Sequence, residues 1–208
     1  MNIKKPLSYC LLTLAMLAAP SLHAANTAEV SNQKTSEMTI TLQEFVTREE
    51  KELKANIIVA QVDANLKVQI PIHKESLNYG QFLTLLNING FTAYKSQDYI
   101  QVIRNRDARS AAIPIVEKDK TYYDDEYVTD YLKPEKACAF KVLSILRPLV
   151  AQYGFLALDE DTHTLIIVDV YSNVKRIKAI MKTIEDNLDS PQDCSNAKQP
   201  EFKPEKKS

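Results

Sequence analysis

The strongest constraint in this sequence is a stretch near its C-terminal end that predicts a one-sided helix. Apolar residues between Val174 and Leu188 recur at offsets of 0, 3, 6, 7, 10 and 14, which places them on one face of a helix. Ser172 or Asn173 is expected to cap its first turn. Such a helix must bury its apolar stripe against another layer, so the surrounding fold needs a sheet or further helices.

The residues before this helix supply both. Three short strands are predicted, the last two forming a hairpin: 127–132, 155–158 and 164–168. Another helix is expected to open at Pro134-Glu135 and to end or kink near Pro148. The resulting order, β-α-β-β-α, predicts a small α+β domain over 122–189.

An earlier alternation of strands and helices predicts another α+β domain over 38–106. Its expected elements are a strand at 38–42, a helix at 43–54, strands at 57–60 and 67–72, a helix at 76–88 and a hairpin at 91–103. Asn56 is expected to end the first helix, and Asn89-Gly90 the second. The segment 107–121 is charged and contains Pro114, which is typical of an inter-domain linker.

Three terminal segments are expected to lie outside these domains. Residues 1–24 combine Lys4 and Lys5 with an apolar run and small residues, which is the pattern of a cleaved secretory signal peptide. A flexible polar leader is predicted over 25–37, and a disordered tail over 190–208. The mature chain is therefore expected to be exported.

Composition argues against several functional classes. The chain has 26 Lys and Arg against 27 Asp and Glu, a balance unlike that of most nucleic-acid-binding domains. Only 3 Gly occur, too few for a Gly-rich phosphate loop. His73 and His163 lie in no catalytic or metal-binding motif, so we predict a protein that is not an enzyme and has no cofactor or metal.

Two cysteines remain after removal of the signal peptide, Cys138 and Cys194. In an exported protein they are candidates for a disulfide. The alternative is that Cys138 is a small core residue of a helix and Cys194 a free thiol in the tail. The sequence leaves both interpretations open.

Basic residues gather on the last predicted helix: Lys175, Arg176, Lys178 and Lys182. One interpretation is a solvated helix face. The other is a contact with an acidic surface of a neighbouring subunit, for which Asp124-Asp125-Glu126 is the candidate. Opposite charges on opposite flanks of a domain would suit head-to-tail packing in a homo-oligomeric ring.

Several short motifs, in the same order along both domains, carry a family resemblance. They are Ile57-Ile58-Val59, Asn89-Gly90-Phe91, Ile100-Gln101-Val102-Ile103, Leu146-Arg147-Pro148-Leu149 and Asn173-Val174-Lys175-Arg176-Ile177. Over 39–188 the chain resembles the first two N-domains of type II secretion secretins. The resemblance implies a two-helix, mixed-sheet first domain, similar also to the signalling domain of TonB-dependent transducers, and a KH-like second domain. No channel domain is expected here, and no Gly-X-X-Gly loop is present to bind nucleic acid.

The resemblance also implies a function. The implied function is that of a periplasmic protein–protein interaction module, which docks to secretin subunits or to inner-membrane secretion components. Contact with the membrane is expected only through those partners. By resemblance, the contact is expected on the strand residues Thr39, Ile40, Thr41 and Leu42, through strand addition. The alternative is that this strand is merely paired inside its own sheet. A signal-receiving domain like that of TonB-dependent transducers and a remnant of a longer secretin are the other functions left open.

Overall fold

The computed structural model describes residues 37–71 and 77–194. It is an α+β structure, which confirms the predicted fold class. The first domain contains, in order, β1 (Glu37–Thr41), α1 (Leu42–Leu53), β2 (Asn56–Val59), β3 (Lys67–Pro71), α2 (Tyr79–Ile88), β4 (Phe91–Ser96) and β5 (Tyr99–Arg104). This order of strands and helices is the one predicted.

Two small sheets build the first domain. β1 pairs with β3 in an antiparallel two-stranded sheet. In the second sheet, β5 lies between β2, to which it is parallel, and β4, to which it is antiparallel. The helices meet in the core, where the rings of Phe45 and Phe82 are 5.5 Å apart. Both side chains are almost fully buried, so α1 and α2 share one apolar core with the sheets.

Local capping decides where the first two helices begin. Thr41 and Glu44 form a capping box at α1, and Asn78 and Gln81 form one at α2. The strand predicted to reach Leu42 therefore ends one residue earlier, and the helix predicted from 76 begins at Tyr79. The end of α2 is as predicted, since Asn89 is its C-cap and Gly90 follows with a φ of 82°.

The first helix ends earlier than predicted. Lys54, in a left-handed conformation with a φ of 50°, is its C-cap. Asn56, expected to end the helix, is instead the first residue of β2.

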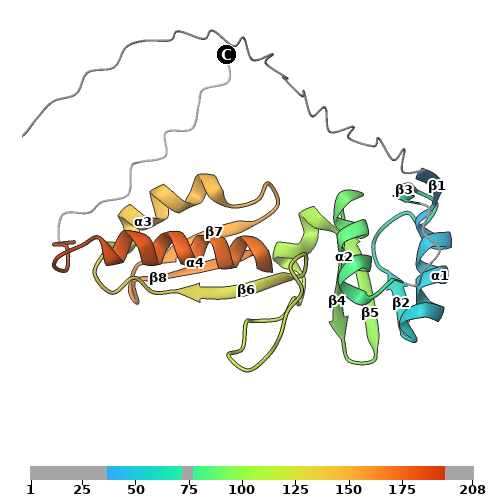
Figure 1. Ribbon diagram of the computed structural model, residues 1–208, viewed down its shortest axis with the longest axis horizontal. Helices are drawn as coiled ribbons and strands as arrows, with labels where there is room; N and C mark the ends of the chain where they lie inside the picture. The colour runs from blue at the N-terminus through green and yellow to red at the C-terminus, as the bar shows by residue number, and fades with distance from the viewer. Residues whose placement is uncertain (1–36, 72–76, 195–208) are drawn as a thin grey trace, which may run out of the picture. The chain divides into compact units, whose positions relative to one another are not determined.

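The second domain has the predicted β-α-β-β-α order. After a 3₁₀ turn, η1 (Asn105–Ser110), its elements are β6 (Tyr127–Leu132), α3 (Ala139–Leu146), η2 (Arg147–Leu149), β7 (Phe155–Asp159), β8 (Thr164–Val170) and α4 (Tyr171–Asp186). The sheet is antiparallel throughout, with β8 between β6 and β7. Helices α3 and α4 pack against this sheet and against each other, covering one of its faces (Figure 1). Pro148 lies in η2, just past the end of α3, as predicted.

Helix α3 starts later than predicted. The residues after Pro134 do not open a helix, because one carboxylate oxygen of Glu185 accepts hydrogen bonds from three consecutive backbone N–H groups. The donors are those of Glu135, Lys136 and Ala137, at 2.7, 2.7 and 3.1 Å. These bonds hold the segment in a bend, and the helix begins only at Ala139.

Helix α4 is not capped by Ser172 or Asn173, so that prediction is wrong. The helix begins at Tyr171, and its N-cap residue makes no side-chain capping bond. The first N–H groups instead donate to backbone carbonyls of the loop before β6: Tyr171 to Glu126 at 2.8 Å and Ser172 to Asp124 at 3.0 Å. Caps from a distant loop replace the local cap that the sequence suggested.

The segment predicted as a linker, 107–121, is partly built into the second domain. Backbone hydrogen bonds join Val116 N–H to the Thr129 carbonyl at 2.8 Å and Thr129 N–H to the Pro114 carbonyl at 2.9 Å. A small apolar cluster joins the three-stranded sheet of the first domain to the sheet of the second domain. Tyr94 and Ile103 are its members from the first domain. Tyr127 and Val168 are its members from the second domain, and burial raises the pKa of Tyr127 to about 12.

Some predictions fall on residues outside the described ranges. These are the signal peptide at 1–24, the leader as far as 36, His73 and the tail from 195 onward. Within the predicted tail, residues 190–194 are described and contact the second domain, where Gln192 N–H donates to the Lys136 carbonyl at 2.8 Å. In the described ranges, no helix is both long and apolar enough to cross a membrane.

Candidate functional site

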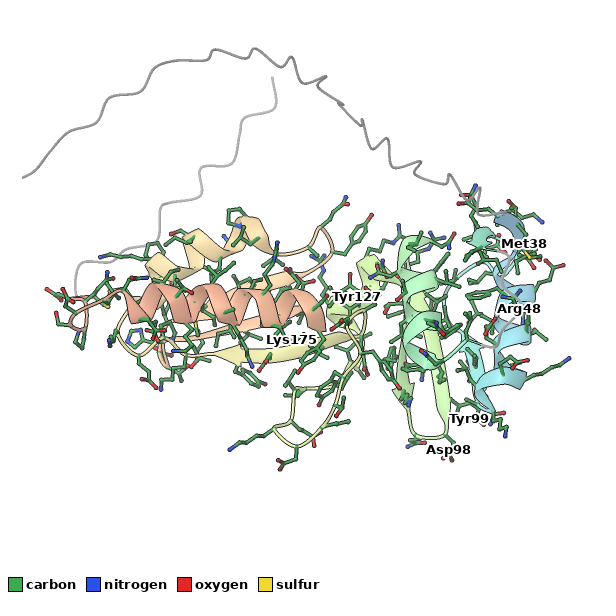
Figure 2. All side chains as sticks on the ribbon, viewed as in Figure 1. Met38, Arg48, Asp98, Tyr99, Tyr127 and Lys175 are labelled. Atoms are coloured by element: carbon green, nitrogen blue, oxygen red, sulfur yellow. A yellow bond between two sulfur atoms is a disulfide. The ribbon has the colours of Figure 1, made fainter. Side chains whose placement is uncertain are left out.

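The two-stranded sheet of β1 and β3 has two outer edges. Its register pairs Met38 with Ile70, Thr39 with Gln69 and Ile40 with Val68. Among the described residues, neither strand has a second β partner. Met38, near the start of β1, is labelled in Figure 2 and packs partly against the first-domain core. Each outer edge is therefore a potential template for an added strand.

The outer edge of β3 is blocked by a side chain. Gln69 N–H donates to Asn89 Oδ1 at 2.8 Å, and Asn89 Nδ2 donates to the Gln69 carbonyl at 2.8 Å. The side-chain amide of Asn89 thus occupies both backbone groups, as a residue of a neighbouring strand would. The sequence predicted only a helix stop at Asn89, and no local signal marks this second role.

The bonding of Gln69 also defines which groups of β1 face outward. In an antiparallel ladder, residues alternate between pairs that bond to each other and pairs whose N–H and C=O groups point away from each other. Because Gln69 directs both groups to Asn89, Thr39↔Gln69 is a pair of the second kind. The backbone N–H and C=O of Thr39 therefore face the outer edge of β1. No described residue bonds to them, and Thr39 is exposed.

The four predicted docking residues therefore differ in what they offer. Thr39 presents its backbone pair at the open edge, whereas Ile40 packs its side chain against the core. Thr41 caps α1, and its N–H donates to Glu44 Oε2 at 2.7 Å. Leu42 is fully buried, and its N–H donates to the Leu66 carbonyl at 2.8 Å, so Leu42 presents neither its side chain nor its N–H at this edge.

The same capping bond affects the charge at this edge. The backbone N–H and the hydroxyl of Thr41 both donate to Glu44, and they hold the pKa of the Glu44 carboxyl below its ordinary value. A carboxylate thus lies one helical turn from the open edge at neutral pH. A basic side chain on a docking strand would be favoured beside it.

The basic residues of α4 are all occupied within the chain. Lys175 Nζ donates to Asp124 Oδ1 at 2.6 Å, a hydrogen bond that raises the pKa of Lys175 (Figure 2 labels Lys175). Lys178 pairs with the buried carboxylate of Asp130. Arg176 donates to the Leu149 carbonyl at 2.7 Å, and Lys182 to Asp186 at 2.8 Å. The expectation that acid and base lie on opposite flanks is wrong for Lys175 and Asp124, which touch.

The two cysteines are joined in the structure, with an S–S distance of 2.01 Å and Cα atoms 5.5 Å apart. Cys138 is buried and precedes α3, whereas Cys194 is exposed. His163 is an exposed residue of the β7–β8 turn, with a φ of 55°. Over the described ranges, no group of His, Cys, Asp and Glu is arranged to hold a metal ion.

Comparisons with known proteins point to one family. No family model matches this chain. Secretin XcpQ of Pseudomonas aeruginosa is 27% identical over 189 residues, which cover 84% of this chain and 28% of XcpQ. Secretin OutD of Dickeya dadantii is 27% identical over 192 residues, covering 88% of this chain and 26% of OutD. The chain thus spans about a quarter of the length of these relatives.

A solved structure shares the fold. It is the Klebsiella pneumoniae type II secretion system outer membrane complex of PulD, PulS and the PulC HR domain. The match has a TM-score of 0.60 and 22% identity, and it covers 73% of this chain and 26% of the matched chain. The resemblance suggested by the short sequence motifs is confirmed by these matches.

Proposed function

Since this chain is homologous to the N-terminal region of type II secretion secretins, we propose that it is a periplasmic, non-catalytic docking module of such a secretion system. Its signal peptide would deliver it to the periplasm, where it contacts membranes only through its partners. The docking contact is an extended strand of the partner added to the outer edge of β1.

One observation carries this proposal: the backbone N–H and C=O of Thr39, to which no residue in the described part of the chain bonds. Strand addition draws its affinity from main-chain hydrogen bonds, which need an accessible edge with unpaired groups. The equivalent groups of Gln69, on the other edge of the same sheet, are already bonded to Asn89. At the Thr39–Gln69 pair, the sheet therefore offers a partner its β1 side and not its β3 side.

The partner we favour is an inner-membrane secretion component. In the Klebsiella complex, a chain of similar fold occurs together with a PulC HR domain and PulS. Secretin subunits are the second candidate, including a ring with copies of this chain. Two aromatic residues of the second-domain sheet favour that candidate, because Tyr131 and Phe155 are 51% and 43% exposed.

The test is a binding measurement on the mature chain with two variants of one residue. The analytes are the PulC-type HR domain and the secretin N-terminal region encoded in the same genome. Thr39→Pro removes the outward N–H, and proline is tolerated at an edge position whose N–H faces solvent. Thr39→Val keeps that donor and is the matched control. We expect Thr39→Pro to weaken HR-domain binding at least about tenfold, and Thr39→Val to bind like the parent chain.

Circular dichroism and thermal unfolding establish that both variants are folded. A folded Thr39→Pro variant that binds the HR domain as the parent does would exclude the β1 edge as the contact. Binding of the secretin region alone would favour the second candidate. If the parent chain bound neither analyte, the docking function itself would be rejected.

A further inference from the structure

The disulfide between Cys138 and Cys194 joins two very different environments. Cys138 is 1% exposed and is the N-cap residue of α3, where its side chain makes no capping hydrogen bond. Cys194 is exposed at the end of the described chain. The two residues are 56 positions apart, so the bond closes a large loop that includes α3, the whole β7–β8 hairpin and α4.

Hydrogen bonds beside the disulfide hold the same two segments together. Gln192 N–H donates to the Lys136 carbonyl at 2.8 Å, and Lys136 Nζ donates to the Leu188 carbonyl at 2.9 Å. Cys138 N–H donates to Gln192 Oε1 at 3.4 Å. We call the disulfide together with these three bonds the clasp. It fastens residues 188–194 to the turn before α3.

A second attachment of this turn does not depend on the clasp. Glu185 belongs to α4 itself, and its carboxylate binds the N–H groups of Glu135, Lys136 and Ala137. Burial alone would raise the pKa of Glu185, but these three backbone hydrogen bonds outweigh it and lower the pKa. The turn before α3 would therefore stay in place if the clasp opened.

We propose that the clasp is redox-sensitive and that Cys194 is its reactive half, a site of S-thiolation by small thiols such as glutathione. Thiol–disulfide exchange requires the attacking thiolate to reach one sulfur along the S–S axis. Of the two cysteines in the disulfide, Cys194 is the one exposed to solvent. Burial shields Cys138 from the same attack.

The exchange proceeds in two balanced steps. Glutathione thiolate bonds to Cys194 Sγ, the Cys138–Cys194 bond breaks, and its electron pair leaves on Cys138 Sγ. That sulfur leaves at the N-terminus of α3, where the helix dipole stabilises negative charge, and it then takes up a proton. A second glutathione thiolate attacks the mixed disulfide, which releases oxidised glutathione and the Cys194 thiolate, and that thiolate takes up a proton.

The structural consequence is local. Once the bond is broken, residues 188–194 keep the packing of Leu188 against the second-domain core and polar contacts that also form readily with water. We expect the part of this segment after Leu188 to detach, while the Glu185 contacts preserve the second-domain core. The clasp lies in the second domain and does not depend on the docking role proposed for Thr39.

The experiment treats the oxidised mature chain with reduced glutathione under native conditions and locates the adduct by peptide mass spectrometry. We expect the mixed disulfide on Cys194. We also expect amide hydrogen exchange in 188–194 to become at least about tenfold faster, with exchange in β8 unchanged. Ser190→Ala, at an exposed position of the same segment, is the control and should behave like the parent chain.

Several results would overturn the proposal. They are a glutathione adduct on Cys138, no adduct until the chain is denatured, or unchanged exchange in 188–194 after reduction. Cys194→Ser provides a second route to the same answer, since it removes the bond without any thiol. It should reproduce the faster exchange of 188–194 with β8 still protected, and loss of protection in β8 would show that the bond stabilises the whole domain instead.

Discussion

The two domains of this chain differ in whether the polar groups of their candidate contact elements are already hydrogen-bonded within the chain. At β1 in the first domain, the backbone of Thr39 keeps both hydrogen-bonding groups unpaired among the described residues. In the second domain, the basic side chains of α4 are each bonded to an acceptor of the same chain. The first arrangement leaves hydrogen-bonding capacity for a partner, whereas the second uses its charges to hold its own loops and helices.

The difference shows that the polar groups most conspicuous in a sequence need not be the ones available to bind a partner. A lysine stripe stands out in a sequence, but its charges are neutralised here by nearby carboxylates. An open strand edge has no distinctive residue type, because its binding groups belong to the backbone. Substitutions at four positions of the second domain test how far it depends on its internal pairs.

The largest effect is expected at Asp169, a fully buried carboxylate. It accepts hydrogen bonds from Ala151 N–H at 2.9 Å, Val170 N–H at 2.7 Å and Asn173 Nδ2 at 2.5 Å. Asp169→Ala leaves the two backbone N–H groups without an acceptor and Asn173 with its bond to the Leu149 carbonyl alone, so we expect the free energy of unfolding to fall by about 3 kcal/mol. Urea unfolding of the parent and variant measures it.

The matched comparison comes from the first domain. Thr41→Ala removes a local helix cap and is expected to lower the unfolding free energy by about 1 kcal/mol. Equal losses for the two variants would contradict the idea that the second domain relies more on internal polar bonds. Should Asp169→Ala not fold, Asp169→Asn keeps the shape and one acceptor oxygen, and it should fall between the parent and the alanine variant.

An intermediate effect is expected within the lysine stripe itself. Lys178 is paired with Asp130, whose side chain is 9% exposed, so Lys178→Ala strands a buried carboxylate and should lower the unfolding free energy by about 2 kcal/mol. Lys182 pairs with Asp186 in solvent, with both side chains more than half exposed. Lys182→Ala should leave the melting temperature unchanged within error. Identical melting temperatures for the two variants would mean that burial of the partner is irrelevant.

The smallest of the expected losses of stability is at Glu185 and depends on pH. Its pKa in the folded chain lies below the ordinary value of 4.5, so its bonds stabilise the fold above that pH. The contribution is lost as the pH falls through the folded-state pKa. Glu185→Gln should lower the unfolding free energy by about 1 kcal/mol at pH 7, a modest figure because solvent screens this partly exposed group. The gap between parent and variant should narrow below pH 4.5, and a constant gap down to pH 3 would refute this account.

Much of the fold could be predicted because it depends on local patterns. The amphipathic stripe from Val174 to Leu188 and the two hairpins follow from residue spacing within short windows. The starts of α3 and α4 could not be predicted in the same way. Glu185 is 50 residues from the first N–H group it binds, and the α4 cap comes from carbonyls of the loop before β6. No pattern within a short window contains such contacts.

The strand proposed for docking was predictable, but the direction of its backbone groups was not. Alternation of apolar and polar residues predicted a strand at 38–42. Which backbone groups face outward depends on the register with β3, and the block on the opposite edge depends on Asn89, 20 positions beyond Gln69. The sequence therefore predicted the element and not the atoms that a partner would meet.

The side-chain amide of Asn89 also limits how far an assembly could grow by strand pairing at this sheet. A filament built by strand pairing needs two usable edges on every subunit, so that each addition creates a new place to add. Here the far side of the β1–β3 sheet is terminated at Gln69. Two copies joined through β1 would present the Gln69 backbone groups already bonded to Asn89, so a further strand could not pair at that position. A strand that occupies β1 would also exclude every competitor for the Thr39 groups.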